Sequence, residues 1–291
     1  MTAITELTTS PQVRPRSVLQ QLLRNPAGVI GLLILLLVIG MALLAPWLYP
    51  GDPLDMVATP LLLPGAQSAY PLGTDAMGRD VIAGIFHGAR VSLLIGVSAT
   101  VIGLLIGTLF GSIGGYFGGV IDNILVRITA LFQTMPAFLL VIILLAIATP
   151  SVSLIAWSIG ITSWPTVARL VRAEFRTLRD AEFVLAARAG GFSAWRIIFQ
   201  EILPNALPAI IVTSSVMVAS AILMESALAF LGLGDPNNVS WGSLIGSGRE
   251  MLRSAWYLTA EPGLALVITI LGLNLLGDAL NDAFNPRLRK R

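Results

Sequence analysis

The side chains that usually carry out chemistry are scarce in this chain. It holds one lysine, Lys290, one histidine, His87, and no cysteine among its 291 residues. A phosphate-binding loop of the G-x-x-x-x-G-K-[ST] type needs a lysine directly after its glycines, and the common zinc sites need several histidines or cysteines. Neither can be built here, and no G-x-S-x-G nucleophile motif occurs. We therefore predict no catalytic residue, no metal site and no cofactor bound by this chain.

Glu225 is the one ionisable residue deep within a long apolar run. A charge in the middle of a bilayer costs roughly 2.5 to 3.5 kcal/mol on insertion scales, so such groups usually face the interior of a helix bundle or a water-filled path. Glu225 is expected toward the outer third of its span, where the cost is smaller. Two roles stay open for it: a structural hydrogen bond between helices, or a position that lines a translocation path or an outer gate.

An arginine-rich segment between apolar runs is the most informative part of the sequence. Ten of the residues from 169 to 205 are charged, in a chain with only 12% charged residues. Phe183–Ala189 suits a short helix, Gly190 and Gly191 can adopt the positive φ that ends one, and Ser193 can cap the next. The pattern fits either a docking surface for a soluble partner or an amphipathic loop on lipid headgroups. The apolar face of the second helix is expected to consist of Trp195, Ile198, Phe199, Ile202 and Leu203, and Pro204 to close that helix.

Uncharged runs predict the membrane spans. A hydrocarbon core of about 30 Å needs roughly 20 apolar residues in a helix. The run from 128 to 168 is too long for one span and is divided at Thr149-Pro150-Ser151, because a proline and the residue before it disfavour helix. The run from 262 to 277 is short, so its helix is expected to carry Asp278 near its inner end. The six predicted spans are Ala27–Trp47, Val91–Tyr116, Ile128–Ala148, Val152–Val171, Ala206–Leu231 and the span over about residues 262–278.

The basic residues are divided unevenly between the two sides of such a protein. Six spans place both termini on the same side as the arginine-rich segment, and that side holds fourteen of the eighteen basic residues. The positive-inside rule assigns it to the cytoplasm. We therefore predict an all-α, polytopic membrane protein with six transmembrane helices and with both termini cytoplasmic.

Two further patterns concern packing. Gly103, Gly107, Gly111 and Gly115 recur every four residues along the second predicted span, a spacing that lets helix backbones approach closely. It predicts either tight packing within this chain or a moving surface against a second subunit. In the outer loop of residues 50–90, a helix at the membrane interface or over a translocation mouth is expected to present Val81, Ile82, Ile85, Phe86 and Ala89 on one face. In the second outer loop, Trp241, Trp256 and Tyr257 are expected in the interfacial aromatic belt.

Four segments resemble one family of transport proteins. Ala186-Ala187, Gly191 and Leu203-Pro204 resemble the EAA loop of the inner-membrane subunits of binding-protein-dependent ABC importers. Leu185 stands where that family has a glutamate, so any role of that acid is absent or moved. Three other segments resemble the C-type permease of the dipeptide, oligopeptide and nickel importers: Tyr70–Gly96 (YPLGTDAMGRDVIAGIFHGARVSLLIG), Gly114–Gly119 (GGYFGG) and Glu225–Gly234 (ESALAFLGLG). The resemblance covers nearly the whole chain, from about Leu22 to Leu288.

The resemblance implies a type I ABC importer permease core with an extra N-terminal span, in the bacterial inner membrane. The implied partners are a sister permease, two ATP-binding subunits that hold ATP and Mg²⁺, an extracytoplasmic solute-binding protein and membrane lipid, with no nucleic acid. This chain would itself be non-catalytic, with ATP hydrolysis in the partner subunits. The ATPase-coupling residues that the resemblance implies are Phe183, Ala186, Ala187, Arg188, Gly190, Gly191, Leu203 and Pro204.

The resulting interpretation divides the chain into four parts. Residues 1–26 form a cytoplasmic tail, 27–90 the first span and an extracytoplasmic loop, and 285–291 a basic cytoplasmic tail. Residues 91–284 form the transmembrane domain, with a cytoplasmic coupling loop at about 173–204. The expected substrates are di- or oligopeptides, with nickel or another small solute as the alternative. A channel or secondary transporter that needs no ATP is the alternative from a different class, and it would leave the arginine-rich segment without a role.

Overall fold

The computed structural model describes residues 18–284. These residues form helices joined by loops and contain no β-strand. The predicted basic tail, 285–291, and residues 1–17 of the predicted N-terminal tail lie outside the described residues. The helices are α1 (Val18–Arg24), α2 (Pro26–Leu48), α3 (Val81–Phe117), α4 (Gly119–Thr134), α5 (Ala137–Leu145), α6 (Val152–Leu178), α7 (Glu182–Ala189), α8 (Ala194–Arg196), a π-helical turn (Ile197–Ile202), α9 (Leu203–Phe230), α10 (Trp241–Gly248), a short 3₁₀ turn (Arg249–Met251) and α11 (Tyr257–Phe284).

Five of the six predicted spans are present as single helices, and the third is a bent helix pair. Between residues 18 and 284, five helices are long and apolar enough to cross a membrane, and there are six if α4 and α5 together are counted as one span. This confirms the prediction of an all-helical, polytopic fold. A continuous span over Ile128–Ala148 was wrong, because the axis bends by 79° between α4 and α5. The bend falls at Pro136, and the residue before it, Met135, has the extended backbone that a following proline favours.

The helix α3 is longer than predicted. The sequence suggested a separate interfacial helix over residues 81–89 and a span that starts at Val91, whereas one helix of 37 residues begins at Val81. Asp80 caps it, since its carboxylate accepts a hydrogen bond from the amide of Ile82 at 3.0 Å. Arg90 does not interrupt the helix because its side chain is exposed. The predicted boundary between residues 90 and 91 therefore falls within α3.

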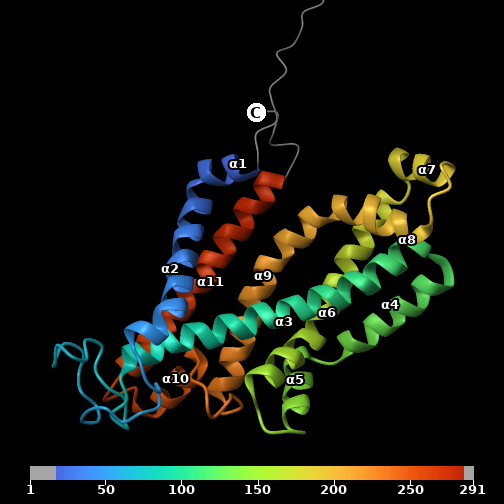
Figure 1. Ribbon diagram of the computed structural model, residues 1–291. Helices are drawn as coiled ribbons and strands as arrows, with labels where there is room; N and C mark the ends of the chain where they lie inside the picture. The colour runs from blue at the N-terminus through green and yellow to red at the C-terminus, as the bar shows by residue number, and fades with distance from the viewer. Residues whose placement is uncertain (1–17, 285–291) are drawn as a thin grey trace, which may run out of the picture.

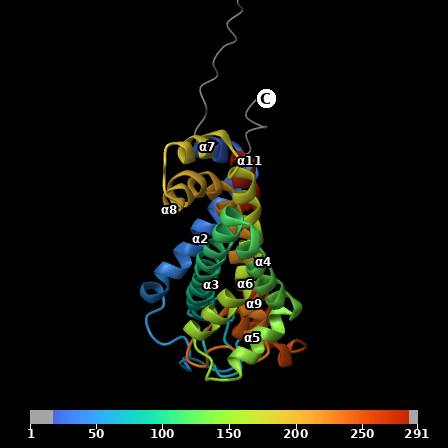
Figure 2. The same cartoon turned by 90° about the vertical axis from the view of Figure 1, so that its right-hand side faces the viewer.

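The helices form an elongated bundle with different structures at its two ends. At 1.5 Å per residue α3 is about 55 Å long, and it crosses the bundle obliquely beside α6 (Figure 1). The helices α2 and α11 run side by side. The turned view places α7, α8 and the C-terminal end of α11 at one end, and α5 near the other (Figure 2). The loop between α2 and α3 and the short helix α10 lie at that second end (Figure 1).

The glycine series of α3 lies directly against α6. A Cβ atom on Gly107 would lie 2.4 Å from Cβ of Val167 and 2.7 Å from the carbonyl oxygen of Trp164. Cβ atoms on Gly103, Gly111 and Gly115 would lie 2.5 to 2.6 Å from other atoms of α6. Such distances are far below van der Waals contact, so any side chain at these positions would push the two helices apart. This face of α3 is occupied by α6 of the same chain.

The contact between α3 and α6 predicts the result of adding one methyl group. Gly107→Ala should lower the thermal unfolding temperature of the protein in detergent, because overpacking of a filled contact costs about 1 to 3 kcal/mol. Gly40→Ala is the matched control: Gly40 lies within α2, and a Cβ there would meet no atom within 4 Å. Its unfolding temperature should stay equal or rise, since alanine favours helix over glycine by about 1 kcal/mol. Equal unfolding temperatures for the two variants would refute the packing argument.

Candidate functional site

A short helix and a glycine turn project from one end of the bundle. We call residues 182–196 the knob. Its helix α7 ends at Gly190, whose amide donates to the carbonyl of Ala186 at 2.9 Å. Gly191 has a φ of +76°, the left-handed conformation that glycine adopts without strain, whereas Gly190 is right-handed. Ser193 then accepts a hydrogen bond from the amide of Arg196 at 3.4 Å and so caps the next helix, as the sequence predicted.

Few side chains attach α7 to the bundle, among them Val184 and Ala187, which pack against it, and Arg188, which lies over the ring of Tyr116 in α3. Val184 is the only buried residue of that helix, and it packs in an apolar cluster with Phe175 of α6 and Ile198 of the π turn. Six of the eight residues of α7 are exposed. A helix that buries so little of its own surface contributes little to packing within this chain. It therefore offers a free surface at the end of the bundle where α1 also lies (Figure 1).

The exposed surface of the knob and the adjoining turn combines aromatic and basic groups. The guanidinium of Arg196 lies 4.0 Å from the ring centre of Phe192, and that of Arg188 lies 5.3 Å from the ring of Tyr116. Cation–π contacts of this kind hold both arginines at the surface without removing their charge. The exposed apolar side chains of this surface are Phe183, Leu185, Phe192, Trp195 and Phe199.

The predicted apolar face of the helix after Ser193 was only partly right. Ile198 and Ile202 are fully buried, whereas Trp195 is 54% exposed and Phe199 is 51% exposed. The reason is the π-helical turn over Ile197–Ile202, which the sequence pattern did not reveal. Its hydrogen bonds reach back five residues, as from the amide of Leu203 to the carbonyl of Ile198, so side chains spaced for an α-helix no longer share one face.

Pro204 does not close this helix, contrary to the prediction. The chain stays helical from Ala194 to Phe230. A proline lacks the amide hydrogen, and its ring crowds the carbonyl four residues earlier, here that of Gln200. The π turn lies where that crowding would occur, and the Asn205 side chain donates to the carbonyl of Glu201 at 2.7 Å. The proline is thus accommodated at the second position of α9.

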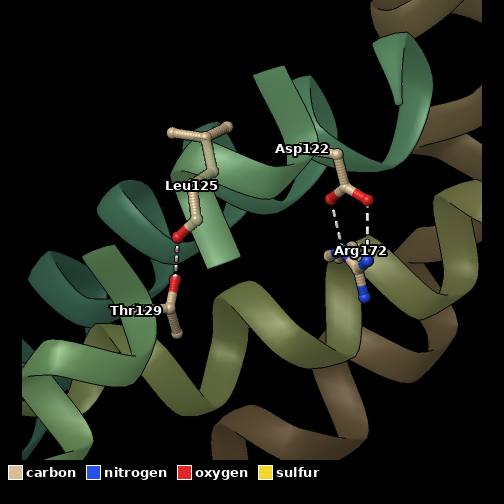
Figure 3. Close-up of polar contacts among 4 residues, drawn as sticks. All are labelled: Asp122, Leu125, Thr129 and Arg172. Atoms are coloured by element: carbon tan, nitrogen blue, oxygen red, sulfur yellow. Dashed lines mark hydrogen bonds and ion pairs between the residues drawn. The ribbon is translucent and has the colours of Figure 1, made fainter. Parts of the chain in front are cut away.

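An ion pair joins α4 to α6 close to the knob. Both carboxylate oxygens of Asp122 accept hydrogen bonds from Arg172, one from Nε and one from Nη2 at 2.7 Å (Figure 3). Asp122 is buried in the first turn of α4. A bidentate pair of this kind fixes direction as well as distance. No sequence pattern singled out this pair, because Asp122 lies between two predicted spans and fifty positions separate it from its partner.

Glu225 joins three helices near the opposite end of the bundle. Its carboxylate is 1% exposed and accepts a hydrogen bond from the hydroxyl of Ser92 in α3 at 3.2 Å. The same hydroxyl accepts from the amide of Trp241 in α10 at 3.3 Å. The indole Nε1 of Trp241 donates to the carbonyl of Ile85 at 3.0 Å. These hydrogen bonds link α3, α9 and α10 to one another, and we call this arrangement a structural tie.

Two of the three aromatic residues predicted for the membrane interface are buried instead. Trp241 and Tyr257 are almost fully buried, and only Trp256, 64% exposed, has a surface that a lipid headgroup could reach. Tyr257 has partners within the protein, because its hydroxyl lies 2.9 Å from the carbonyl oxygen of Leu62 and 3.0 Å from that of Thr74. The polar atoms of Trp241 and Tyr257 thus have hydrogen-bond partners within the protein rather than at the membrane interface. We call the loop of residues 49–80 together with α10 the cap.

Residues of the segment Tyr70–Asp80 hold the cap together by hydrogen bonds to the preceding part of the loop. Thr74 is buried, donates its hydroxyl to the carbonyl of Thr59 at 2.6 Å and accepts from the amide of Leu62 at 3.0 Å. Gly73 has a φ of +76°, and a Cβ there would lie 2.1 Å from the Leu62 carbonyl, so only glycine fits. Burial raises the pKa of the Asp80 carboxyl above its usual value. The hydrogen bonds from the amides of Ile82 and Ala83 lower the pKa and so reduce this shift.

Comparison with known proteins identifies the architecture. A family model described as a binding-protein-dependent transport system inner membrane component matches residues 103–290. A second, described as the N-terminal TM domain of oligopeptide transport permease C, matches residues 16–64. The di/tripeptide transport system permease protein DppC of Pseudomonas aeruginosa is 37% identical over 276 residues, which cover 93% of this chain and 91% of that protein. The dipeptide transport system permease protein DppC of Escherichia coli K12 is 39% identical over 273 residues, 92% of this chain and 91% of that protein.

Further matches extend this picture. A probable peptide ABC transporter permease protein of Sinorhizobium fredii is 40% identical over 283 residues, 97% of this chain and 96% of that protein. The inward-facing MetNI methionine ABC transporter has a chain with a similar fold, at a TM-score of 0.55 and 16% identity, over 70% of this chain and 96% of that one. The resemblance seen in the sequence is thereby confirmed. The chain belongs to the binding-protein-dependent ABC importer family, as an inner-membrane permease subunit of the C type.

Proposed function

We propose that this chain forms part of the translocation path of a peptide importer and receives the motion of a separate ATPase through the knob. The observation that supports the coupling role is the exposure of α7, a helix in which Val184 alone is buried. An exposed face of aromatic and basic groups suits a cleft in a soluble partner. The coupling residues proposed are Phe183, Ala186, Ala187, Arg188, Gly190, Gly191, Leu203 and Pro204.

The proposed assembly contains four kinds of partner. They are a sister permease, two ATP-binding subunits, an extracytoplasmic solute-binding protein and the surrounding lipid. ATP and Mg²⁺ would bind to the ATP-binding subunits, since the single lysine of this chain, Lys290, does not follow a glycine-rich loop. Hydrolysis is therefore assigned to those subunits. The family description supports a binding protein as the source of substrate.

Peptides are the proposed substrates. Three similar proteins carry a peptide, dipeptide or di/tripeptide in their names, and each covers more than nine-tenths of this chain. These names favour a peptide over nickel or another small solute. The alternative is a channel or secondary transporter, which has no ATPase to bind at the exposed helix α7. The coupling experiment below distinguishes the two functions.

The knob end of the bundle is proposed to face the cytoplasm. The helices α1 and α7 and the C-terminal end of α11 lie at that end, and the capped loop before α3 lies at the other (Figure 1). All six arginines of the segment from 169 to 205 belong to α6, the knob or the chain between them. By the positive-inside rule this end is cytoplasmic.

Glu225 is proposed to act as a structural tie. Its hydrogen bond to Ser92 holds α9 against α3, and Ser92 in turn holds the start of α10. Loss of the carboxylate would leave the buried hydroxyls of Ser92 and Ser226 without their acceptor. A role in the translocation path or gate is the competing reading.

The orientation predicts which single cysteines react with a reagent added from outside the cell. The chain has no native cysteine, so each variant reports one position. Asp55→Cys and Asn237→Cys, both at exposed positions of the capped end, should be labelled in intact cells. Arg176→Cys and Arg289→Cys should be labelled only after the cells are opened. Labelling of Arg176→Cys from outside would overturn the orientation.

The coupling role predicts the effect of an acid in the knob. Gly191→Asp strains a left-handed position by about 1 to 3 kcal/mol and adds a negative charge to the exposed surface, where a Cβ meets no atom within 4 Å. Gly191→Asp, and Ala187→Asp beside it, should leave the subunit in the membrane but release the ATPase or uncouple its turnover from uptake. Co-purification of the complex and ATP-driven uptake in vesicles measure this.

The matched control for Gly191→Asp is Gly65→Asp in the capped outer loop. Gly65 has a φ of +77°, and a Cβ there also meets no atom within 4 Å, so the local strain is the same while the knob is untouched. The ATPase should stay bound in this variant. If both knob variants transport like the wild type, the coupling assignment is wrong and the channel or secondary transporter becomes the better explanation.

The structural tie predicts a stability effect at Glu225. Glu225→Ala should lower the unfolding temperature of the purified subunit, because buried polar groups left without a partner cost about 1 to 3 kcal/mol. Glu225→Gln keeps one acceptor oxygen and should retain most of the stability and the transport rate. Unchanged stability in Glu225→Ala together with altered uptake in Glu225→Gln would favour the translocation path or gate instead.

A further inference from the structure

A cavity lined with hydroxyl groups lies between α3, α6 and α9. Its volume is about 270 Å³, and none of its twelve lining residues is charged. Thr100, Thr162 and Thr213 each lie in the central third of their helices, so the cavity is far from both ends of the bundle. A group of hydroxyls at that depth is costly to place against hydrocarbon and suits a water-filled path. The hydroxyl-bearing side chains are Thr100, Thr162, Ser163, Thr166, Thr213 and Ser220.

The hydrogen bonds of these side chains decide what the wall can bind. Thr162 donates its hydroxyl hydrogen to the carbonyl of Ile159 at 2.9 Å, and Thr213 donates to that of Ala209 at 2.9 Å. A hydroxyl whose hydrogen is already donated within its own helix still has lone pairs that can accept a hydrogen bond from another group. The wall therefore offers acceptors to N–H groups of a solute, with no fixed charge to select among ionised ones.

Thr100 supplies an independent sign of a ligand. It is 3% exposed, lines the cavity, and its Oγ1 has no hydrogen-bond partner within residues 18–284. A buried polar group without a partner is unfavourable by about 1 to 3 kcal/mol, so such a hydroxyl is kept where something else bonds to it.

The break between α4 and α5 brings backbone donors to the same place. The first residue of α5, Ala137, lines the cavity, and no side chain caps that end of the helix. The first amides of a helix have no partner within it and point outward from its end. Broken membrane helices use such ends to contact polar groups of a transported solute. The start of α5 thus adds uncapped amide groups next to the hydroxyl-lined wall.

The size of the cavity limits the occupant. Small-molecule sites usually measure roughly 300 to 1,000 Å³, so a cavity of about 270 Å³ holds only a small solute or a short part of a longer one. Met217 and Met224 complete the wall, and their flexible side chains adapt to different shapes.

We propose that this cavity is a transit site for the backbone of a peptide, whose amide N–H groups donate to the threonine and serine hydroxyls while its carbonyls accept from Thr100 and the first amides of α5. This proposal rests on the proposed peptide transport. Because the wall is uncharged and partly flexible, the site binds the backbone of the peptide and accepts peptide side chains of either charge.

Single cysteines test whether the cavity is a watery path. Ser220→Cys lies in the wall, and Leu223→Cys is its control, since Leu223 is 47% exposed, lies one turn along the same helix and does not line the cavity. The full complex in inner-membrane vesicles is treated with a charged, water-soluble thiol reagent. Ser220→Cys should react several-fold faster than Leu223→Cys, and a transported dipeptide should slow it. Equal rates for the two cysteines, or no protection by a dipeptide that is transported, would overturn the proposal.

An N-methylated dipeptide tests the hydrogen bonds. It lacks the amide hydrogen, so about fivefold more of it should be needed for the same protection of Ser220→Cys, as expected for one lost hydrogen bond. Equal protection would overturn the assignment of the hydroxyls as acceptors. If the wild-type complex takes up no peptide, the proposed function fails, whereas the labelling rates of the two cysteines are measured without any substrate.

Thr100→Val separates a binding role from a structural one. Removal of a buried hydroxyl without a partner should leave the unfolding temperature equal or higher, yet it should raise the KM for dipeptide uptake several-fold. Thr269→Val is the control: Thr269 is buried in α11, donates to the carbonyl of Ala265 and lies outside the cavity. A wild-type KM in Thr100→Val would overturn the role of this hydroxyl.

Discussion

The close contact between α3 and α6 is the constraint on which the rest of this structure depends. Four glycines of α3 bring its backbone against α6, and no side chain larger than hydrogen fits there. In a bilayer no hydrophobic force drives helices together, so van der Waals contact at this distance is the main source of their attachment. Because α3 begins in the capped loop and α6 ends at the knob, this one contact connects the two ends of the molecule.

The helix α6 carries three of the features described above. Phe175 packs in the cluster that holds Val184 of the knob, Arg172 pairs with Asp122 of α4, and Thr162 lines the hydroxyl cavity. All three lie within one unbroken helix of 27 residues. The knob and the cavity are thus connected by one continuous helix, as the proposed coupling role requires.

Much of this organisation follows from residue types that can be read in order along the chain. The apolar runs show where spans occur, Gly191 and Ser193 show where α7 ends and the next helix begins, and the glycines at every fourth position show a close helix contact. These features could be predicted because each depends on neighbours within a few residues. The same logic failed where one local rule overrode another, as at Pro136, which breaks the third span, and at the π turn before Pro204.

The sequence by itself determined the class of the protein: a polytopic helical membrane subunit with an arginine-rich helical segment between its apolar runs. Only the tertiary structure decided which partners the isolated polar residues have. Asp122 meets Arg172 fifty positions away, Glu225 meets Ser92 across 133 positions, and Trp241 is buried in a cap rather than placed at the lipid interface. The hydroxyls of three separate helices gather around one cavity only after folding. Such pairings depend on how helices cross in space, and helix periodicity carries no information about crossing.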